Sequence, residues 1–395
     1  MSKSNPGTRD EPAGADGRPA GEEHRLRKYL KFIALCLLAV LVLAWFVRGT
    51  NWSEVSGAMG RADWRLVALA VVLVWLTYLV RAFRWRALLA PLAPRASLRE
   101  AFAATTVGFS AIFLVGRGVG EVLRPAYLPL RDPNVRPGAA FVTIAVERIY
   151  DMTAVIVMFA ANLLVLRLPG VEDAMLARVR EAGLILLVGA LAGVGALVLF
   201  RGRAERVTAW LDARAGRLPR PVARGLKVLT GLLGQLARTL GVLTDARALL
   251  VTVGWTAALW AAIALANMLV LRAFGIPLGM SEAVFVLGWS LVGSLVPTPG
   301  GGAGTYHAAT AHGLTYYLGV PDSEAKAATI VLHLVVFGSA LFFGLYYFLR
   351  SGLSLGRLRE LMASEAAEAE AESRAAAGRD GGGPSGGGAR RAASA

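Results

Sequence analysis

The chain is poor in charged residues and in the side chains that form disulfides and metal sites. Only 17% of its residues are charged, whereas water-soluble domains carry roughly 25%. Its single cysteine, Cys36, excludes an intrachain disulfide. There is no HExxH motif, and His307 and His312 are five positions apart, which points them to different sides of a helix. We therefore expect no metal site and no cofactor.

The residues of common enzymatic sites are scarce as well. Ser110, Ser290 and Ser294 have no nearby histidine and carboxylate pattern, so the sequence supports no acyl-enzyme chemistry. The net charge of +15 does not indicate nucleic-acid binding, because the basic residues flank apolar segments and form no separate polar domain. We interpret them as topology signals and contacts for anionic lipid headgroups. Enzymatic activity stays undecided, and a protein that is not an enzyme is favoured.

Apolar residues are abundant and make up 55% of the chain. Segments of roughly 20 apolar residues recur, and each is long enough to cross about 30 Å of hydrocarbon as a helix. The alternating pattern of a membrane β-barrel is absent. The sequence therefore predicts an all-α polytopic membrane protein with about six transmembrane helices. The expected spans lie at about 29–47, 65–80, 139–167, 182–200, 248–273 and 326–349.

Two further apolar segments are interrupted and do not read as simple spans. Residues 100–123 contain Gly116, Gly118 and Gly120, and residues 282–318 contain the run Val-Pro-Thr-Pro-Gly-Gly-Gly. Prolines and clustered glycines do not continue a helix. We predict two re-entrant helical hairpins that approach from opposite sides of the membrane. Interrupted segments of this kind in the two halves of a chain are typical of transporter sites near the bilayer midplane.

Basic residues predict the topology. Arg81, Arg84, Arg86, Arg95 and Arg99 follow the second span, and the positive-inside rule places this expected loop in the cytoplasm. The protein is then expected in a bacterial-type inner membrane, with both termini cytoplasmic. A long polar tail precedes the first span and no small-residue cleavage site follows it, which favours a retained anchor over a signal peptide.

The expected organisation has three parts. Residues 1–24 form a disordered tail, residues 25–350 form the membrane domain, and residues 351–395 form a disordered cytoplasmic tail. Within the membrane domain, residues 201–247 are a basic cytoplasmic segment whose apolar residues recur at helical spacing. A homo-oligomer is compatible with this organisation.

Charged residues inside apolar segments are the strongest functional candidates. Glu147, Arg148 and Asp151 share one sector of the helix over 139–167. A charged side chain near the centre of a membrane helix costs roughly 2.5–3.5 kcal/mol, so these groups must pair or line a wet cavity. The candidate substrate-binding residues are Glu121, Arg124, Glu147, Arg148, Asp151, Arg117, Pro297, Pro299 and Gly300.

Two interpretations of these residues stay open. The charges form a purely structural network, or they face a substrate, for which the planar fork of arginine suits a lipid phosphate. The glycines of 100–123 either admit a ligand close to the backbone or allow close helix packing. The Pro-Gly run either exposes backbone amides and carbonyls or is a linker between helices.

Four motifs, taken in order, resemble the transmembrane region of lysylphosphatidylglycerol synthases, a family of flippase-like integral membrane proteins. They cover about 45–350 and are Arg84-Trp85-Arg86-Ala87-Leu88-Leu89, Gly120-Glu121-Val122-Leu123-Arg124, Glu147-Arg148-Ile149-Tyr150-Asp151 and Val296-Pro297-Thr298-Pro299-Gly300-Gly301. One difference concerns Arg117. The family commonly has a proline and then an arginine three residues before the glutamate, whereas Gly116 and Gly118 hold those places here.

The resemblance implies that the protein handles a membrane lipid, such as a phospholipid or a polyprenyl- or hopanoid-type lipid, and moves it between leaflets. Full-length synthases carry a soluble aminoacyl transferase domain after the membrane part, and this chain continues only into a short Ala/Gly tail, so lysyl transfer is not expected. We predict a lipid translocase or lipid-binding membrane protein. The alternatives are a membrane-embedded transferase acting on a lipid-linked substrate and an accessory subunit of an envelope lipid biosynthesis complex.

Overall fold

The computed structural model describes residues 40–48, 50–166, 173–215 and 246–351, together with the isolated positions 37, 230 and 233. Both predicted tails, most of the expected first span and most of the basic segment 201–247 lie outside the described residues. Every regular element in the described ranges is a helix. Four helical stretches there are long and apolar enough to cross a membrane. The predicted all-α polytopic membrane fold is confirmed.

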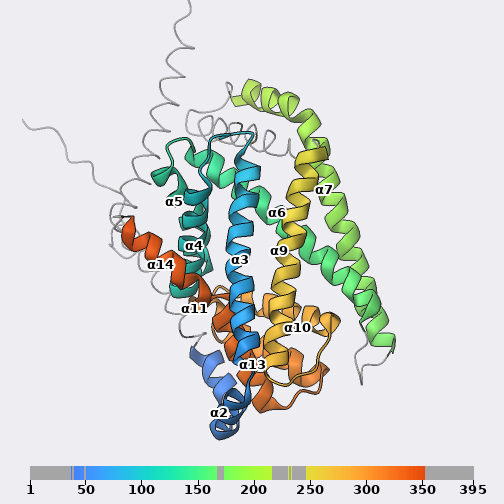
Figure 1. The fold of residues 1–395 in the computed structure, drawn as a ribbon. Coiled ribbons are helices and arrows are strands. Elements are labelled where there is room, and N and C mark those ends of the chain that lie inside the picture. The colour runs from blue at the N-terminus through green and yellow to red at the C-terminus, as the bar shows by residue number, and fades with distance from the viewer. Residues whose placement is uncertain are drawn as a thin grey trace, which may run out of the picture.

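The four membrane-length stretches are α3 (Trp64–Leu89), α6 (Pro137–Val165), Arg247–Ala273 within α9 (Ala246–Ala273), and Asp322–Arg350. The last of these joins α13 (Asp322–Val336), a 3-10 turn η3 (Gly338–Ala340) and α14 (Leu341–Arg350). Helices α3 and α9 lie side by side and nearly parallel, whereas α6 crosses them obliquely (Figure 1). The short helix α2 (Trp52–Arg61) precedes α3, and the long helix α7 (Asp173–Ala215) contains the shorter apolar stretch Gly183–Ala196.

Helix α3 corrects one expectation. It begins after the capping side chain of Asp63, whose carboxylate accepts a hydrogen bond from the Arg65 backbone amide, and it continues to Leu89. Arg81 and Arg84 therefore lie inside the helix and are buried, not in a cytoplasmic loop. The prediction was wrong because it treated charge as the end of the span, whereas counter-charges on a neighbouring helix keep these arginines within it.

The first interrupted segment is a helical hairpin made of α4 (Leu98–Leu114) and α5 (Arg117–Arg131). Its two ends meet: the Ser97 amide donates to Asp132 at 2.7 Å, and Arg131 Nε lies 3.3 Å from a Glu100 oxygen. The returning arm ends later than the predicted end at residue 123, because the helix runs on through two prolines to Arg131.

Glycines allow the two arms of this hairpin to touch. A Cβ atom at Gly120 would overlap the backbone carbonyl oxygen of Gly108 and the Ile112 side chain, whereas one at Gly118 would meet nothing within 4 Å. Close helix packing is therefore the role of Gly120. Gly116, at the turn, adopts φ 132°, a left-handed value that favours glycine.

The second interrupted segment is also a hairpin. It consists of α10 (Met280–Ser294), a broken turn that includes α11 (Pro299–Gly302), and α12 (Thr305–His312) continued by the π-helical η2 (Gly313–Tyr317). The arms are joined by a 2.9 Å hydrogen bond between the Ser290 and Thr310 hydroxyls. The helix breaks at the predicted Pro-Gly run, where Gly300, Gly301, Gly302 and Gly304 all have positive φ.

The turns of the two hairpins face each other. A Cβ atom at Gly116 would lie 3.9 Å from Pro299 Cα and 3.9 Å from the Thr298 carbonyl oxygen. Figure 1 shows α4 and α5 on one side of this meeting point, and α10 and α13 on the other. The turns of the two broken segments, which are far apart in the sequence, thus lie against each other.

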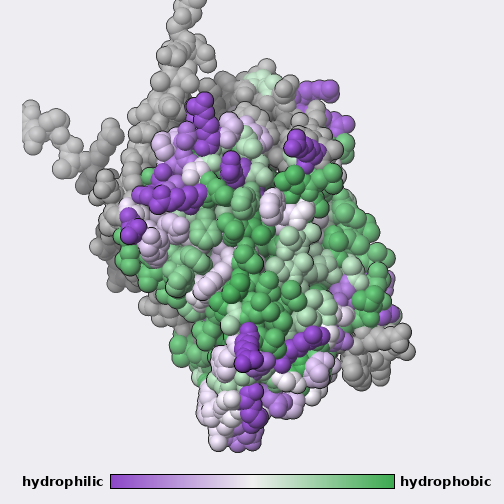
Figure 2. Space-filling view, viewed as in Figure 1, coloured by the Kyte–Doolittle hydropathy of each residue, from purple (hydrophilic) through white to green (hydrophobic). Residues whose placement is uncertain are grey.

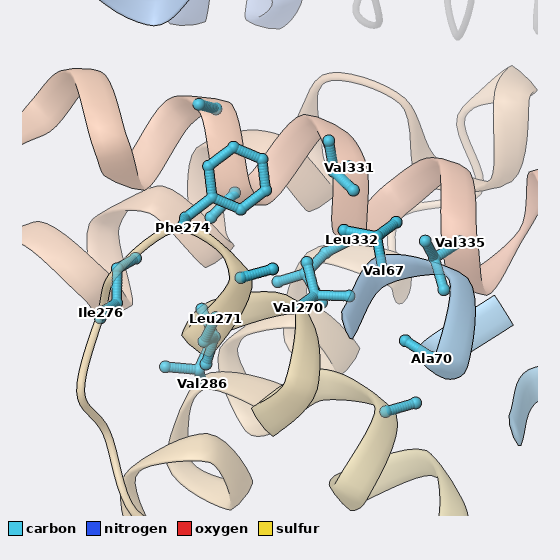
Figure 3. Close-up of a cluster of buried hydrophobic side chains, with 14 of the residues drawn as sticks. Val67, Ala70, Val270, Leu271, Phe274, Ile276, Val286, Val331, Leu332 and Val335 are labelled. Carbon is cyan, nitrogen blue, oxygen red and sulfur yellow. The ribbon is translucent and has the colours of Figure 1, made fainter. Parts of the chain in front are cut away.

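Two apolar clusters hold the helices together. One joins α2, α3, α9, α10 and α13, and Figure 3 shows its branched aliphatic side chains, among them Val270, Leu271 and Val331. The other joins α3 to α4, α5 and α6 around Trp85 and Tyr127. On the outside, Figure 2 shows hydrophobic residues over the middle of the visible face and hydrophilic residues toward both ends, as expected for a protein surrounded by lipid.

Candidate functional site

Helix α6 places two carboxylates in the protein interior. Glu147 and Asp151 are one helical turn apart, so their side chains lie on the same face of α6. Glu147 has no exposed surface and Asp151 is 5% exposed. Unpaired carboxylates are expensive at such positions. Each must therefore meet a cation from another helix.

The first hairpin provides the partner for Glu147. Arg124 of α5 donates two hydrogen bonds to its carboxylate, Nη1 to Oε1 at 2.6 Å and Nη2 to Oε2 at 3.0 Å. The Arg124 guanidinium also lies over the Trp85 ring of α3, 4.5 Å from its centroid. A paired, parallel arrangement of this kind is among the strongest charged interactions in proteins. It ties the hairpin to α6.

Helix α3 provides the central cation of the site. Arg84 donates to both Asp151 oxygens, from Nη1 to Oδ1 at 2.7 Å and from Nη2 to Oδ2 at 3.1 Å, and its Nη2 lies 3.2 Å from Glu147 Oε1. The side chain has no exposed surface. Arg84 therefore bridges the two carboxylates and connects α3 to α6.

Helix α9 completes the network with neutral groups. The Thr256 hydroxyl accepts a hydrogen bond from Arg84 Nη1 at 3.2 Å, and Trp260 Nε1 donates to Asp151 Oδ1 at 3.3 Å. Four elements, α3, α5, α6 and α9, thus converge on two carboxylates. The sequence analysis missed both α9 residues, because a threonine and a tryptophan in an apolar span carry no charge signal.

Two more arginines lie at the edge of this network and are held less tightly. Arg81 Nη1 is 3.9 Å from Asp151 Oδ2, and its guanidinium lies over Phe109, 4.7 Å from the ring centroid. Arg148 Nη1 is 4.0 Å from the same Asp151 oxygen, and its side chain is 36% exposed. We call the four arginines and two carboxylates the arginine cluster; its members are Arg81, Arg84, Arg124, Arg148, Glu147 and Asp151.

The arginine cluster carries more positive than negative charge. Four guanidinium groups face two carboxylates, which leaves a surplus of two positive charges. The Nε atoms of all four arginines are buried and have no hydrogen-bond partner in the part of the chain that the structure describes. Buried donors without partners are rare in proteins. The arrangement can therefore donate hydrogen bonds to an added anionic group that brings acceptor oxygens, and that group would neutralise part of its charge.

The structure brings together some of the predicted site residues and separates others. Arg124, Glu147 and Asp151 form the centre of the arginine cluster, with Arg148 at its edge. Arg117 and Glu121 instead pair with each other at 4.0 Å, each about one-third exposed, on the outer face of α5. Pro297, Pro299 and Gly300 belong to the turn of the second hairpin, beside the turn of the first.

Arg84 and Arg81 were missed as site residues. A signal for Arg84 was present, because the Arg84-Trp85-Arg86 motif lies in a span interrupted by no proline or glycine. Its spacing puts Arg81 and Arg84 on one side of a helix, three residues apart. Among the described residues, no group of three or more histidine, cysteine or acidic side chains converges as a metal site would require.

Comparison with known proteins identifies relatives over most of the membrane part. The family described as the lysylphosphatidylglycerol synthase TM region matches residues 32–344. The chain is 25% identical over 334 residues to a protein named glycosyltransferase AglD from Haloferax volcanii. The match covers 79% of this chain and 53% of AglD, so the chain spans about half the length of that relative. No solved structure matches the chain.

Proposed function

The chain belongs to the lysylphosphatidylglycerol synthase transmembrane-region family, and from this membership we propose that it binds a membrane lipid with an anionic headgroup and moves it between leaflets. The arginine cluster is the proposed headgroup site. Glu147 and Asp151 hold the arginines in place, and the arginines bind the headgroup. We further propose a bacterial-type inner membrane, with the first hairpin entering from the cytoplasmic side.

The surplus of buried positive charge carries this proposal. A network that served only stability would be expected to balance its charges, because each unpaired charge in the interior adds a desolvation penalty. Instead two arginines of the cluster have only long contacts to a carboxylate that is already bound by Arg84. Guanidinium groups suit the paired oxygens of a phosphate. A lipid phosphate is therefore the ligand that this site favours.

The two hairpins suggest how a headgroup could pass. Their turns meet near the middle of the helical assembly, and broken helices at this depth are typical of sites that alternate between two sides of a membrane. The turn of the second hairpin contains four glycines with positive φ, whose backbone can change conformation without a side-chain clash. In this proposal, the hairpins separate the site from the two aqueous sides in turn.

Transport in vesicles tests the proposal. Purified protein is reconstituted with phosphatidylglycerol that carries a fluorescent label, and reduction of the label by external dithionite reports movement between leaflets. Wild-type protein is expected to accelerate this movement. Glu147→Gln removes the negative charge that pairs with Arg124 and with Nη2 of Arg84, and it is expected to abolish the acceleration. Arg86→Gln, on an exposed position of the same helix α3 as Arg84, is the matched control and should behave as wild type.

Folding and function are separated by a second variant. Arg148→Gln removes a charge at the edge of the cluster, on a side chain that is about one-third exposed, and is expected to leave the thermal unfolding temperature unchanged. A clear loss of transport in this folded variant supports the headgroup site. Unchanged transport in Arg148→Gln and in a folded Glu147→Gln variant would mean that the charges serve stability alone, and the proposal would be abandoned.

A second candidate function comes from the likeness to AglD, which is named a glycosyltransferase. In this alternative the chain handles an isoprenoid lipid that carries a sugar through phosphate, either as an embedded transferase or as an accessory subunit of an envelope biosynthesis complex. Incubation with lipid-linked sugar donors, followed by mass spectrometry for a covalently changed product, tests the transferase. Deletion of 216–245 followed by co-purification tests whether the basic segment 201–247 binds partner subunits.

A further inference from the structure

A cavity lies beside the arginine cluster, between α3, α4, α9 and the end of α13. Its volume is about 50 Å³, and Arg81 contributes the one charged side chain among its lining residues. A single buried water needs roughly 10–15 Å³ on this measure, so the cavity has room for a group of several polar atoms. Its lining residues are Val74, Thr77, Tyr78, Arg81, Phe109, Ile263, Val336 and Phe337.

Arg81 is the arginine of the buried cluster that is least committed to a protein partner. Arg84 and Arg124 each donate two hydrogen bonds to a carboxylate, at 2.6–3.1 Å. Arg81 has one contact, at 3.9 Å, to an oxygen that Arg84 already binds. Its side chain is only 10% exposed, and its Nε has no hydrogen-bond partner among the described residues. A charge buried this deeply needs a better counter-charge.

The surroundings of Arg81 determine which kind of anionic group would fit beside it. The Arg81 guanidinium lies over the Phe109 ring, which covers one face of the guanidinium plane. Its N–H donors lie in that plane, so an acceptor must approach from the edge of the group. Two hydroxyl groups line the cavity. That of Thr77 donates a short hydrogen bond to the Val74 carbonyl, at 2.6 Å, whereas that of Tyr78 has a long one to the Val336 carbonyl, at 3.3 Å. An oxyanion in the cavity could thus receive hydrogen bonds from Arg81 and Tyr78, while apolar walls exclude a bulky polar group.

Charge balance limits the ligand to a single negative charge. The fully buried part of the cluster consists of Arg81, Arg84 and Arg124 against Glu147 and Asp151, which leaves one positive charge. Arg148 is left out of this balance because its side chain is 36% exposed and lies at the edge of the cluster. One phosphodiester carries one negative charge. A phosphomonoester or a diphosphate would bring two or more negative charges, which exceeds the one positive charge of this buried part.

We propose that Arg81 and its cavity form the binding site for one phosphodiester group, with Arg81 as the residue that binds it and Tyr78 as the second donor. This inference rests on the proposed lipid function and names the headgroup chemistry. The phosphodiester is that of a glycerophospholipid or that of an isoprenoid phosphate joined to a sugar. A phosphodiester bound in the cavity would also affect the second hairpin. Phe337 lines the cavity and packs against Gly301 in the turn of that hairpin.

Binding of short-chain lipids to the purified full-length protein tests, without any mutation, whether the site prefers a ligand with a single negative charge. Two probes are phosphodiesters: dihexanoyl phosphatidylglycerol and a farnesyl-phosphate-linked mannose. The comparison probes are dihexanoyl phosphatidic acid and farnesyl diphosphate, which carry more negative charge, and dihexanoyl glycerol, which is uncharged. We expect a phosphodiester to bind at least tenfold more tightly than the other probes of the same tail. The better of the two phosphodiesters identifies the lipid class. Tighter binding of phosphatidic acid or farnesyl diphosphate would overturn the inference.

Variants of Arg81 test the residue. Arg81→Gln is expected to weaken phosphodiester binding about tenfold or more, because a hydrogen-bonded charge is lost, and to reduce the discrimination against the uncharged lipid. Arg81→Lys keeps the charge and should bind with intermediate affinity, and Arg86→Gln should bind as wild type. Arg81→Gln should fold, because Arg84 still holds Asp151.

The outcomes separate this inference from the proposed function. Phosphodiester binding by Arg81→Gln equal to that of Arg86→Gln refutes the Arg81 site, and a concurrent loss of transport in Glu147→Gln leaves the lipid function standing. If the wild-type protein accelerates no lipid movement and binds none of the probes, both fail together.

Discussion

The two hairpins of this protein meet at their turns but are built from different chemistry. The first, α4 and α5, is closed at its base by Asp132 and by the Arg131–Glu100 ion pair, and it delivers Arg124 to the arginine cluster. The second, α10 to η2, has no acidic or basic residue other than histidine between Ala283 and Pro321. It is held by hydroxyl pairs and rings, such as Ser290 with Thr310 and Trp289 with Tyr317.

Under the proposed function, this difference assigns headgroup binding to the first hairpin and movement to the second. Directional charged pairs hold the first hairpin in one place, as a binding site requires. The second hairpin has a glycine-rich turn and interactions that are individually weak, so alternative positions cost less free energy. Its turn packs on a buried pair of imidazoles, His307 and His333, whose ring centroids are 4.6 Å apart. We expect the first hairpin to be the fixed partner and the second to be the moving one.

The largest effect is expected from Arg124→Gln in the first hairpin. Removal of this guanidinium leaves Glu147, which has no exposed surface, with only a share of Arg84. Loss of one member of a buried ion pair destabilises by about 3–5 kcal/mol. Unfolding followed in detergent by tryptophan fluorescence measures the loss, and Arg131→Gln, whose pair is partly exposed, should cost less than about 1 kcal/mol. Equal losses in the two variants would contradict the fixed role of Arg124.

The crossing of α4 and α5 gives the next largest effect. Gly120→Ala places a methyl group against the Gly108 backbone and Ile112, which is expected to destabilise by about 1–3 kcal/mol and to abolish transport. Gly118→Ala, two residues away with open space around it, is the matched control and should be neutral or slightly stabilising. A tolerated Gly120→Ala with wild-type transport would show that the arms do not pack closely in the membrane.

The turn of the second hairpin is expected to respond to Gly301→Ala. An alanine at φ 69° costs about 1–2 kcal/mol, and the added methyl group presses on Phe337, 3.1 Å away. Gly275→Ala has a similar φ of 71° and no neighbour within 4 Å, so it carries the backbone cost alone. Transport is expected to slow in Gly301→Ala and to stay normal in Gly275→Ala. The same transport rate in both variants would argue against movement of this turn.

The smallest effect is expected within the arms of the second hairpin. Ser290→Ala removes one hydroxyl pair, and Thr310 keeps its 2.7 Å hydrogen bond to the Tyr306 carbonyl. The loss should therefore be about 0.5–1.5 kcal/mol. Measured in the same detergent, Ser290→Ala and Arg124→Gln together compare how much free energy of unfolding one interaction contributes in each hairpin. A loss as large as that of Arg124→Gln would remove the distinction between them.

Much of the fold could be predicted because membrane helices are long and apolar by necessity. The expected spans at 139–167 and 248–273 differ from α6 and α9 by at most two residues at either end. The breaks at Gly116 and at the Pro-Gly run could also be placed, because these residues do not continue a helix. The end of α3 was misplaced, since hydropathy along the chain does not record whether an arginine meets a carboxylate elsewhere.

By itself, the sequence determined that this protein is a bundle of membrane helices with two interrupted hairpins and with charges that need partners. Only the tertiary structure decided which charges meet: Arg84 and Arg124 with Glu147 and Asp151, while Arg117 and Glu121 pair away from the cluster. The physical reason is the separation along the chain between the residues that interact. Helix formation and burial in lipid depend on neighbours along the chain, whereas an ion pair depends on a distance of a few ångströms between helices that the sequence keeps far apart.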